Sequence, residues 1–153
     1  MTGDARITVC LVSSHGGHLR ELLDATRGVI GEKYYVTCRT RHTEELLGRE
    51  RHYFVMDPHV SKWKYVVNAV QSVGHLLRQR PDVVISTGAG IAIPTILMCR
   101  YLLGAKVVFI ESAANVNHPS RTGMFVYRLA DLFLVQWEGL TRYYPNAVHV
   151  GLL

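Results

Sequence analysis

Residues 7–22 read "ITVCLVSSHGGHLREL" and mark the point where a strand gives way to a helix. Residues 7–12 form an almost continuous apolar run, which is typical of a parallel strand covered on both faces. Gly16 and Gly17 follow, and a helical pattern begins at Gly17. The stretch therefore predicts a strand–loop–helix unit in which the loop backbone carries almost no side chains.

The same alternation continues along the chain. Strand-like runs occur at residues 7–12, 34–38, 53–56, 83–86, 107–111, 132–136 and 148–150. Helical patterns lie between them at residues 17–26, 43–49, 62–78, 91–103 and 122–130, with a short one near Leu140. This order predicts a single α/β domain over residues 1–153, built as a Rossmann-like, doubly wound parallel sheet.

The composition excludes a disordered chain and favours an anionic partner. Hydrophobic residues make up 48% of the 153 residues, enough for a real core. Lysine and arginine number 17 against 12 acidic residues, which gives a formal charge of +5. That excess is compatible with nucleic acid, acidic lipid or a phosphorylated ligand.

The cysteines and the apolar stretches indicate a cytoplasmic protein. Cys10, Cys38 and Cys99 lie far apart in apolar runs, so we expect reduced core residues rather than disulfides or a metal site. No signal-peptide pattern precedes the first strand, and the low-charge stretch at residues 87–99 is too short to span a bilayer. Any membrane contact is therefore expected to be peripheral.

Polar and glycine residues gather where ligands bind in such sheets, at the carboxyl ends of the strands. The residues expected at this edge are Ser14, His15, Gly16, Gly17 and His18, then Thr87, Gly88, Ala89 and Gly90, and finally Glu111 and Asn115. Glycines that open a helix after a strand expose backbone N–H groups, which suits phosphate. Glycines also simply permit tight turns, but two such loops on one edge favour ligand binding.

Other nucleotide and hydrolase motifs are absent from the sequence. The first loop lacks G-x-G-x-x-G, and Ile93 stands where the second loop would need its third glycine. Arg39 ends the second strand region and is able to accept a 2′-phosphate, so an NADP-binding reductase remains an alternative. We find no P-loop, no Asp-x-Asp pair for a metal–nucleotide complex and no Gly-x-Ser-x-Gly elbow. No metal or cofactor is expected.

The motifs resemble those of GT-B glycosyltransferases that act on polyprenyl-diphosphate acceptors. Residues 14–18 resemble the first glycine loop of these enzymes, and residues 86–90 with Pro94 resemble the second. Residues 109–114 occupy the place of the strand end that carries a glutamate in the family. Residues 145–151 resemble the segment that leads out of the first domain. The closest resemblance is to the bacterial exopolysaccharide subunits PssD and CpsF. These are similar to the anchoring subunit of the enzyme that builds dolichol-linked chitobiose.

The resemblance implies a specific division of labour. The chain would be equivalent to the N-terminal domain of a GT-B enzyme and would bind the acceptor, a polyprenyl-diphosphate-linked saccharide. A donor-binding partner subunit would supply most of the UDP-sugar site in a heterodimer. The reaction would be inverting and metal-independent, on the inner face of the cell membrane, in exopolysaccharide or capsule synthesis, without nucleic acid. A non-catalytic anchor or enhancer of the partner is the alternative.

Two residues are candidates for the catalytic base. His18 carries an imidazole, the side chain that most often acts as a general base, and it matches the histidine of the family loop, although it is also placed to cap or pack against the helix. Glu111 ends an apolar strand, where an acid is costly unless it is exposed at the ligand edge or paired. Asn115 and Arg121 are candidates for contacts with the acceptor diphosphate.

One helical segment is a candidate for membrane contact. It has an apolar face at helical spacing, with cations at its ends. The residues of this face are Val60, Trp63, Val66, Val67, Val70, Val73 and Leu77. Trp63, Lys64 and Tyr65 suit the interface of a bilayer. The alternative is an ordinary crossover helix that buries this stripe on the sheet. Residues 98–103 are a second candidate.

Overall fold

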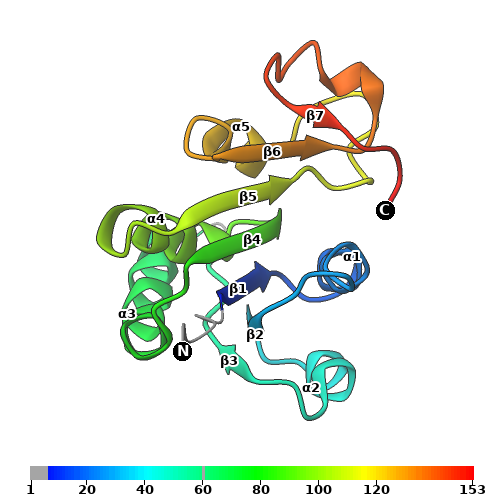
Figure 1. Cartoon of the computed structure of the whole chain (residues 1–153). Coiled ribbons are helices and arrows are strands. Elements are labelled where there is room, and N and C mark those ends of the chain that lie inside the picture. Colours follow the sequence, from blue (N-terminus) through cyan, green and yellow to red (C-terminus); the bar gives the residue numbers. More distant parts are fainter. Residues whose placement is uncertain (1–6, 60) are drawn as a thin grey trace, which may run out of the picture.

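A computed structural model describes residues 7–59 and 61–153, and within them a single parallel sheet forms the centre of the molecule (Figure 1). Its strands are β1 (Thr8–Ser13), β2 (Glu32–Thr37), β3 (His52–Phe54), β4 (Val83–Gly88), β5 (Lys106–Ile110), β6 (Leu132–Val135) and β7 (Val148–His149). Their spatial order is β3-β2-β1-β4-β5-β6-β7. This is the predicted doubly wound topology, and the strand order reverses between β1 and β4.

Helices cover both faces of the sheet (Figure 1). They are α1 (Gly17–Ala25), α2 (Arg41–Leu47), α3 (Lys62–Gln79), α4 (Ala92–Leu102) and α5 (Arg121–Val126), with a 3₁₀ turn, η1 (Glu138–Leu140). Leu22 of α1 packs in one buried cluster with Leu11 of β1. Leu76 of α3 and Ile96 of α4 pack in the other cluster with Val12. Alternate residues of β1 therefore pack into the two different hydrophobic clusters, which explains why the apolar run of this strand is continuous.

The C-terminal part of the predicted helix at residues 122–130 is not helical. α5 ends at Val126, and the next residues turn so that Asp131 N reaches Val107 O at 2.8 Å. The chain has to leave the helix there because β6 begins at Leu132. The three cysteines are free and buried, as predicted.

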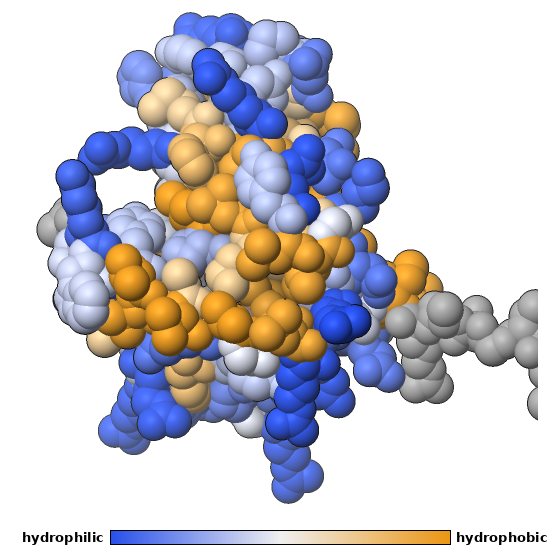
Figure 2. Space-filling view, turned by 90° about the vertical axis from the view of Figure 1, so that its left-hand side faces the viewer, coloured by the Kyte–Doolittle hydropathy of each residue, from blue (hydrophilic) through white to orange (hydrophobic). Residues whose placement is uncertain are grey.

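α3 presents most of its apolar side chains to solvent, so the alternative in which this stripe is buried on the sheet is wrong. Trp63 is 69% exposed. The other exposed apolar residues of the helix are Val66, Val70, Val73 and Leu77. Figure 2 shows an apolar band on the side of the molecule that carries α3 and α4. Val60 lies outside the described residues. We call the exposed row from Trp63 to Leu77 the α3 stripe.

The buried side of α3 carries three polar residues beside Leu76, and two of them are hydrogen-bonded. Asn68 Nδ2 donates to Met56 O at 2.8 Å, and Ser72 Oγ lies 3.3 Å from Thr95 Oγ1 of α4. Burial lowers the pKa of His75 to about 4, which keeps this side chain neutral. Hydrogen bonds remove most of the penalty for burying such groups. The apolar face of α3 therefore remains open to a partner outside this domain.

Candidate functional site

The two glycine loops meet where the strand order reverses. His18 Nδ1 lies 3.1 Å from the Thr87 carbonyl oxygen, and Thr87 Oγ1 donates to His18 O at 2.7 Å. A carbonyl only accepts, so the proton of the neutral ring sits on Nδ1 and leaves Nε2 as an acceptor. The β1–β4 register also shifts between Val12 and Ser13, just before this loop. The fold thus fixes both the position and the tautomer of His18.

The start of α1 is open to a ligand. Gly16 has φ 76° and ψ −136°, a backbone conformation that residues with a side chain rarely adopt. A Cβ on Gly17 would meet nothing within 4 Å, so no packing within the domain requires this glycine. The helix has no side-chain cap and no acidic residue in its first turn. Its first N–H groups are therefore left for another acceptor.

The second glycine loop has a structural explanation for part of its sequence. A Cβ on Gly90 would lie 2.5 Å from the hydroxyl oxygen of Tyr65, which reaches over from the start of α3. Gly88 has φ 113° and Ala89 has φ 67°, so the loop turns sharply after β4. Gly90 lacks a side chain because Tyr65 packs against it. This glycine therefore does not indicate a phosphate site.

Glu21 is the site residue that the sequence analysis missed. A cavity of about 430 Å³ beside α1 is lined by Gly17, His18, Arg20, Glu21, Asp24, Ser112, Ala113, Ala114 and Leu153. Glu21 Oε1 accepts hydrogen bonds from Ala113 N at 2.7 Å and from Gln136 Nε2 at 2.5 Å. Its Oε2 is buried and has no partner in the described part of the chain. An unsatisfied buried carboxylate oxygen is costly, and a ligand hydroxyl would satisfy it.

Glu111 lies in a closed network. It is 1% exposed, and it is not among the residues that line the cavity beside α1. Asn115 Nδ2 donates to its Oε1 at 2.9 Å, and Tyr144 Oη donates to its Oε2 at 2.7 Å. Burial, with the hydrogen bond to Glu111, raises the pKa of Tyr144. These contacts indicate a structural role for Glu111, and its role as catalytic base stays a prediction.

Several residues expected at the ligand edge lie away from His18. The His15 ring faces Cys38 and lines a different cavity, towards β2 and β3. Arg121 begins α5 and lines a third cavity with Tyr65 and Gly90. Three more have protein partners: Ser14 Oγ donates to His15 O, Asn115 binds Glu111, and Arg39 pairs with Glu44 at 3.3 Å. The structure thus gathers Gly17, His18 and Thr87 with Glu21, while the others are dispersed.

None of the helices in the described part of the chain combines the length and the apolarity that crossing a membrane requires.

Sequence comparison finds oligosaccharide-synthesis proteins. A family profile described as "Oligosaccharide biosynthesis protein Alg14 like" matches residues 55–153. UDP-N-acetylglucosamine transferase subunit ALG14 from Candida albicans is 37% identical over 83 residues, which cover 51% of this chain and 38% of that protein. The human protein of the same name is 25% identical over 180 residues, covering 95% of this chain and 82% of that one. Coverage of these relatives is thus partial, and in the Candida protein it is less than half.

Structural comparison shows the same fold in larger proteins. MurG from Acinetobacter baumannii superposes with a TM-score of 0.69 at 18% identity, over 87% of this chain and 42% of MurG. UDP-N-acetylglucosamine 2-epimerase from Rickettsia bellii gives a TM-score of 0.70 at 12% identity, over 92% of this chain and 41% of the epimerase. At these identities the likeness concerns the fold alone.

Proposed function

The chain belongs to the Alg14-like family of oligosaccharide biosynthesis proteins, and from this we propose that it is the acceptor-binding, membrane-recruiting subunit of a two-component glycosyltransferase. The relatives in Candida albicans and human are named as subunits of a UDP-N-acetylglucosamine transferase. In this proposal a partner subunit binds the UDP-sugar, and this chain binds a polyprenyl-diphosphate-linked saccharide. The reductase alternative gains no support from these relatives.

The observation that carries the proposal is the cavity beside α1. It combines the open start of a helix with His18 and with the unpaired Oε2 of Glu21. A helix start favours an anion such as a diphosphate. An acceptor sugar needs, in addition, a base near its hydroxyl group and a hydrogen-bond acceptor to orient it. All three features border the same cavity.

We assign the proton transfer to His18. The acceptor hydroxyl oxygen forms the new bond to the anomeric carbon of the donor while the bond to UDP breaks, and UDP leaves with the electron pair. The hydroxyl proton passes to His18 Nε2, the nitrogen that the Thr87 carbonyl leaves unprotonated. Glu21 Oε2 would accept a hydrogen bond from a sugar hydroxyl and so position it. A single displacement of this kind inverts the donor configuration.

We further propose that the polymer to which this transferase contributes is a bacterial polysaccharide. The motifs of the chain, taken together, resemble those of the PssD and CpsF subunits, which favours bacterial exopolysaccharide or capsule synthesis. The reaction would then take place on the inner face of the cell membrane, with the donor-binding subunit as partner in a heterodimer.

Reconstitution tests the division of labour. The purified chain should bind a short-chain polyprenyl-diphosphate-linked sugar at least about tenfold more tightly than UDP-N-acetylglucosamine, and it should show no transfer alone. Adding the donor-binding subunit should restore transfer, measured with radiolabelled UDP-sugar. Robust transfer by the chain alone contradicts the two-component proposal. Tight NADPH binding in a fluorescence titration would instead support the reductase.

The α3 stripe supports membrane recruitment. Five apolar side chains from Trp63 to Leu77 face solvent on one helix, and Lys62 and Lys64 stand at its start. A row of apolar residues with an aromatic side chain and cations at its end suits the boundary between lipid headgroups and acyl chains. We therefore propose that α3 lies on the bilayer, with Trp63 and Lys64 as the interfacial contacts. Tyr65, which was predicted beside them, instead packs against Gly90 within the domain.

Vesicle binding tests this surface. The protein should sediment with vesicles that contain anionic lipid, and added salt should release part of it because exposed charges are screened over about 8–10 Å. Trp63→Ser combined with Val70→Ser should weaken binding by about tenfold or more, because two apolar side chains no longer leave water. Ile30→Ser is the matched control, since Ile30 is 93% exposed and follows α1, which covers the opposite face. Equal binding of both variants would place the membrane contact elsewhere.

A further inference from the structure

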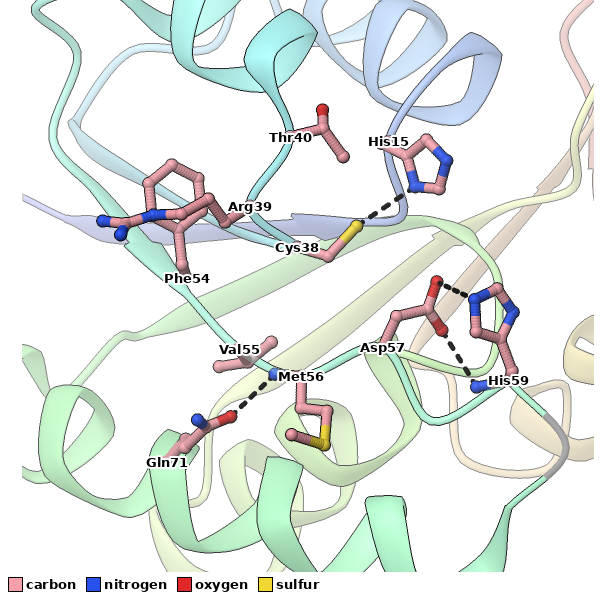
Figure 3. Close-up of a pocket in the computed structure, with 10 residues that line it drawn as sticks. All are labelled: His15, Cys38, Arg39, Thr40, Phe54, Val55, Met56, Asp57, His59 and Gln71. Carbon is pink, nitrogen blue, oxygen red and sulfur yellow. Dashed lines mark hydrogen bonds and ion pairs between the residues drawn. The ribbon is translucent and has the colours of Figure 1, made fainter.

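A second cavity, of about 600 Å³, lies at the carboxyl ends of β1, β2 and β3 and shares no lining residue with the cavity beside α1. Figure 3 shows His15 and Cys38 pointing toward each other at its wall, with Asp57 close by. One ligand atom from each residue lies within 4.8 Å of the others. His15 Nδ1 and Cys38 Sγ are 3.1 Å apart. The sequence analysis expected Cys38 to be an inert core residue and did not connect it with either neighbour.

The fold explains why these three residues meet. His15 follows the end of β1, Cys38 follows the last residue of β2, and Asp57 lies three residues beyond β3. The ends of neighbouring parallel strands lie side by side, so residues that are far apart in the chain converge there. Cys38 is buried, and the side chain of Asp57 is only 20% exposed. One of the three groups is therefore buried, and a second is mostly covered by the protein.

The chemistry of the set matches a zinc-class metal. A thiolate, an imidazole and a carboxylate are the three ligand types that Zn²⁺ takes in proteins. A thiolate selects such metals over Mg²⁺ or Ca²⁺, which prefer oxygen ligands. Ligand atoms of a tetrahedral site lie roughly 3.3–3.6 Å from each other, given bonds of about 2.0–2.3 Å to the metal. The 3.1 Å between His15 and Cys38 is close to that spacing.

A neighbouring histidine holds the carboxylate in place. His59 N donates to Asp57 Oδ1 at 3.0 Å, and His59 Nε2 lies 3.7 Å from Asp57 Oδ2. Partners of this kind orient the ligands of metal sites and raise their affinity. Figure 3 shows both contacts on the side of Asp57 away from Cys38.

We propose that His15, Cys38 and Asp57 bind one zinc-class divalent metal, with the fourth position left to water or to a ligand oxygen. Such a metal would tie the loop after β1 to the ends of β2 and β3. That loop runs through Gly16 and Gly17 into His18, so the metal would brace the segment that carries the proposed base. This proposal stands on the geometry of the second cavity and does not depend on the acceptor chemistry.

Cobalt is a suitable probe, because Co²⁺ bound to a thiolate absorbs in the near ultraviolet. Titrating the reduced, full-length protein with Co²⁺ should give this absorption with an endpoint at one equivalent, and Zn²⁺ should abolish it. Cys38→Ser, His15→Gln and Asp57→Asn should each raise the dissociation constant by about 100-fold or more. Circular dichroism checks their folding, and the exposed His15 keeps the test valid if the Cys38 variant does not fold.

The matched controls are Cys99→Ala, at a buried cysteine of α4 that does not line this cavity, and His42→Gln, at an exposed histidine of α2. Both should bind Co²⁺ like the unmodified protein. The proposal is overturned by the absence of thiolate absorption at one equivalent, or by unchanged affinity in a folded His15→Gln variant. Loss of the signal in Cys99→Ala would likewise overturn it, because the thiolate would then be a different one.

Discussion

Replacing His18 by alanine is expected to lower the turnover of the reconstituted transferase by about a hundredfold or more, the usual contribution of a general base. The hydrogen bond from His18 Nδ1 to the Thr87 carbonyl fixes the tautomer that leaves Nε2 able to accept a proton. Neither alanine nor glutamine is able to take that proton. His18→Gln should therefore lose turnover almost as completely, although its amide preserves hydrogen bonding.

Matched variants separate the base from residues that only position the acceptor. His42→Gln, on the exposed surface of α2, should leave turnover unchanged. Glu21→Gln should raise the acceptor KM more than it lowers kcat, because its proposed task is to orient a hydroxyl. Near-normal turnover in His18→Gln would reject the base role. If Glu111→Gln alone were inactive and still folded, the base would be the carboxylate.

Gly123→Ala should destabilise the domain by about 3 kcal/mol, the upper end of the usual cost of forcing an added atom into a tightly packed interior. A Cβ at this position would overlap with Glu111 Oε2 and would lie 2.7 Å from Tyr144 Oη. Glu111 is buried and binds Tyr144, so the carboxylate has no space into which to retreat. Urea unfolding followed by circular dichroism measures the loss.

Gly74→Ala is the control for this change. Gly74 lies within α3 with nothing within 4 Å of an added Cβ. Alanine should therefore stabilise the domain there by roughly 0.5–1 kcal/mol, the ordinary helix effect. The same substitution is thus expected to have opposite signs at the two sites. An unfolding midpoint for Gly123→Ala equal to that of the unmodified protein would show that Glu111 and Tyr144 do not pack tightly against Gly123.

The strands and most of the helices were predictable because their signals are local. The continuous apolar run of β1 reflects burial on both faces, and the glycine pair marks the start of α1 within one residue. The fold and the place of His18 follow from these patterns and from the general rule on strand ends. The end of α5 was not predictable, because it depends on where Asp131 joins the sheet.

The features that the sequence did not reveal depend on long-range contacts. Glu21 finds its partners Ala113 and Gln136 at separations of 92 and 115 residues. One local signal was present: Glu21 lies three residues after His18, on the same side of α1. The stripe of α3 was visible as periodicity, but periodicity identifies a face without saying what covers it. Asn68 and Ser72 decide the orientation because α4 and the loop after β3 satisfy their hydrogen bonds.

If α3 holds the protein on a bilayer, as proposed, its outward-facing stripe has a kinetic consequence. A protein held on a bilayer meets a lipid-linked acceptor by lateral diffusion, so the search takes place in two dimensions instead of three. Its encounter rate then depends on the surface density of acceptor and on how long the protein stays bound to the lipid. As with any tethered pair, confinement raises the effective concentration without any new contact. Under these conditions a cavity of modest affinity would suffice, and the time spent on the membrane would set the flux.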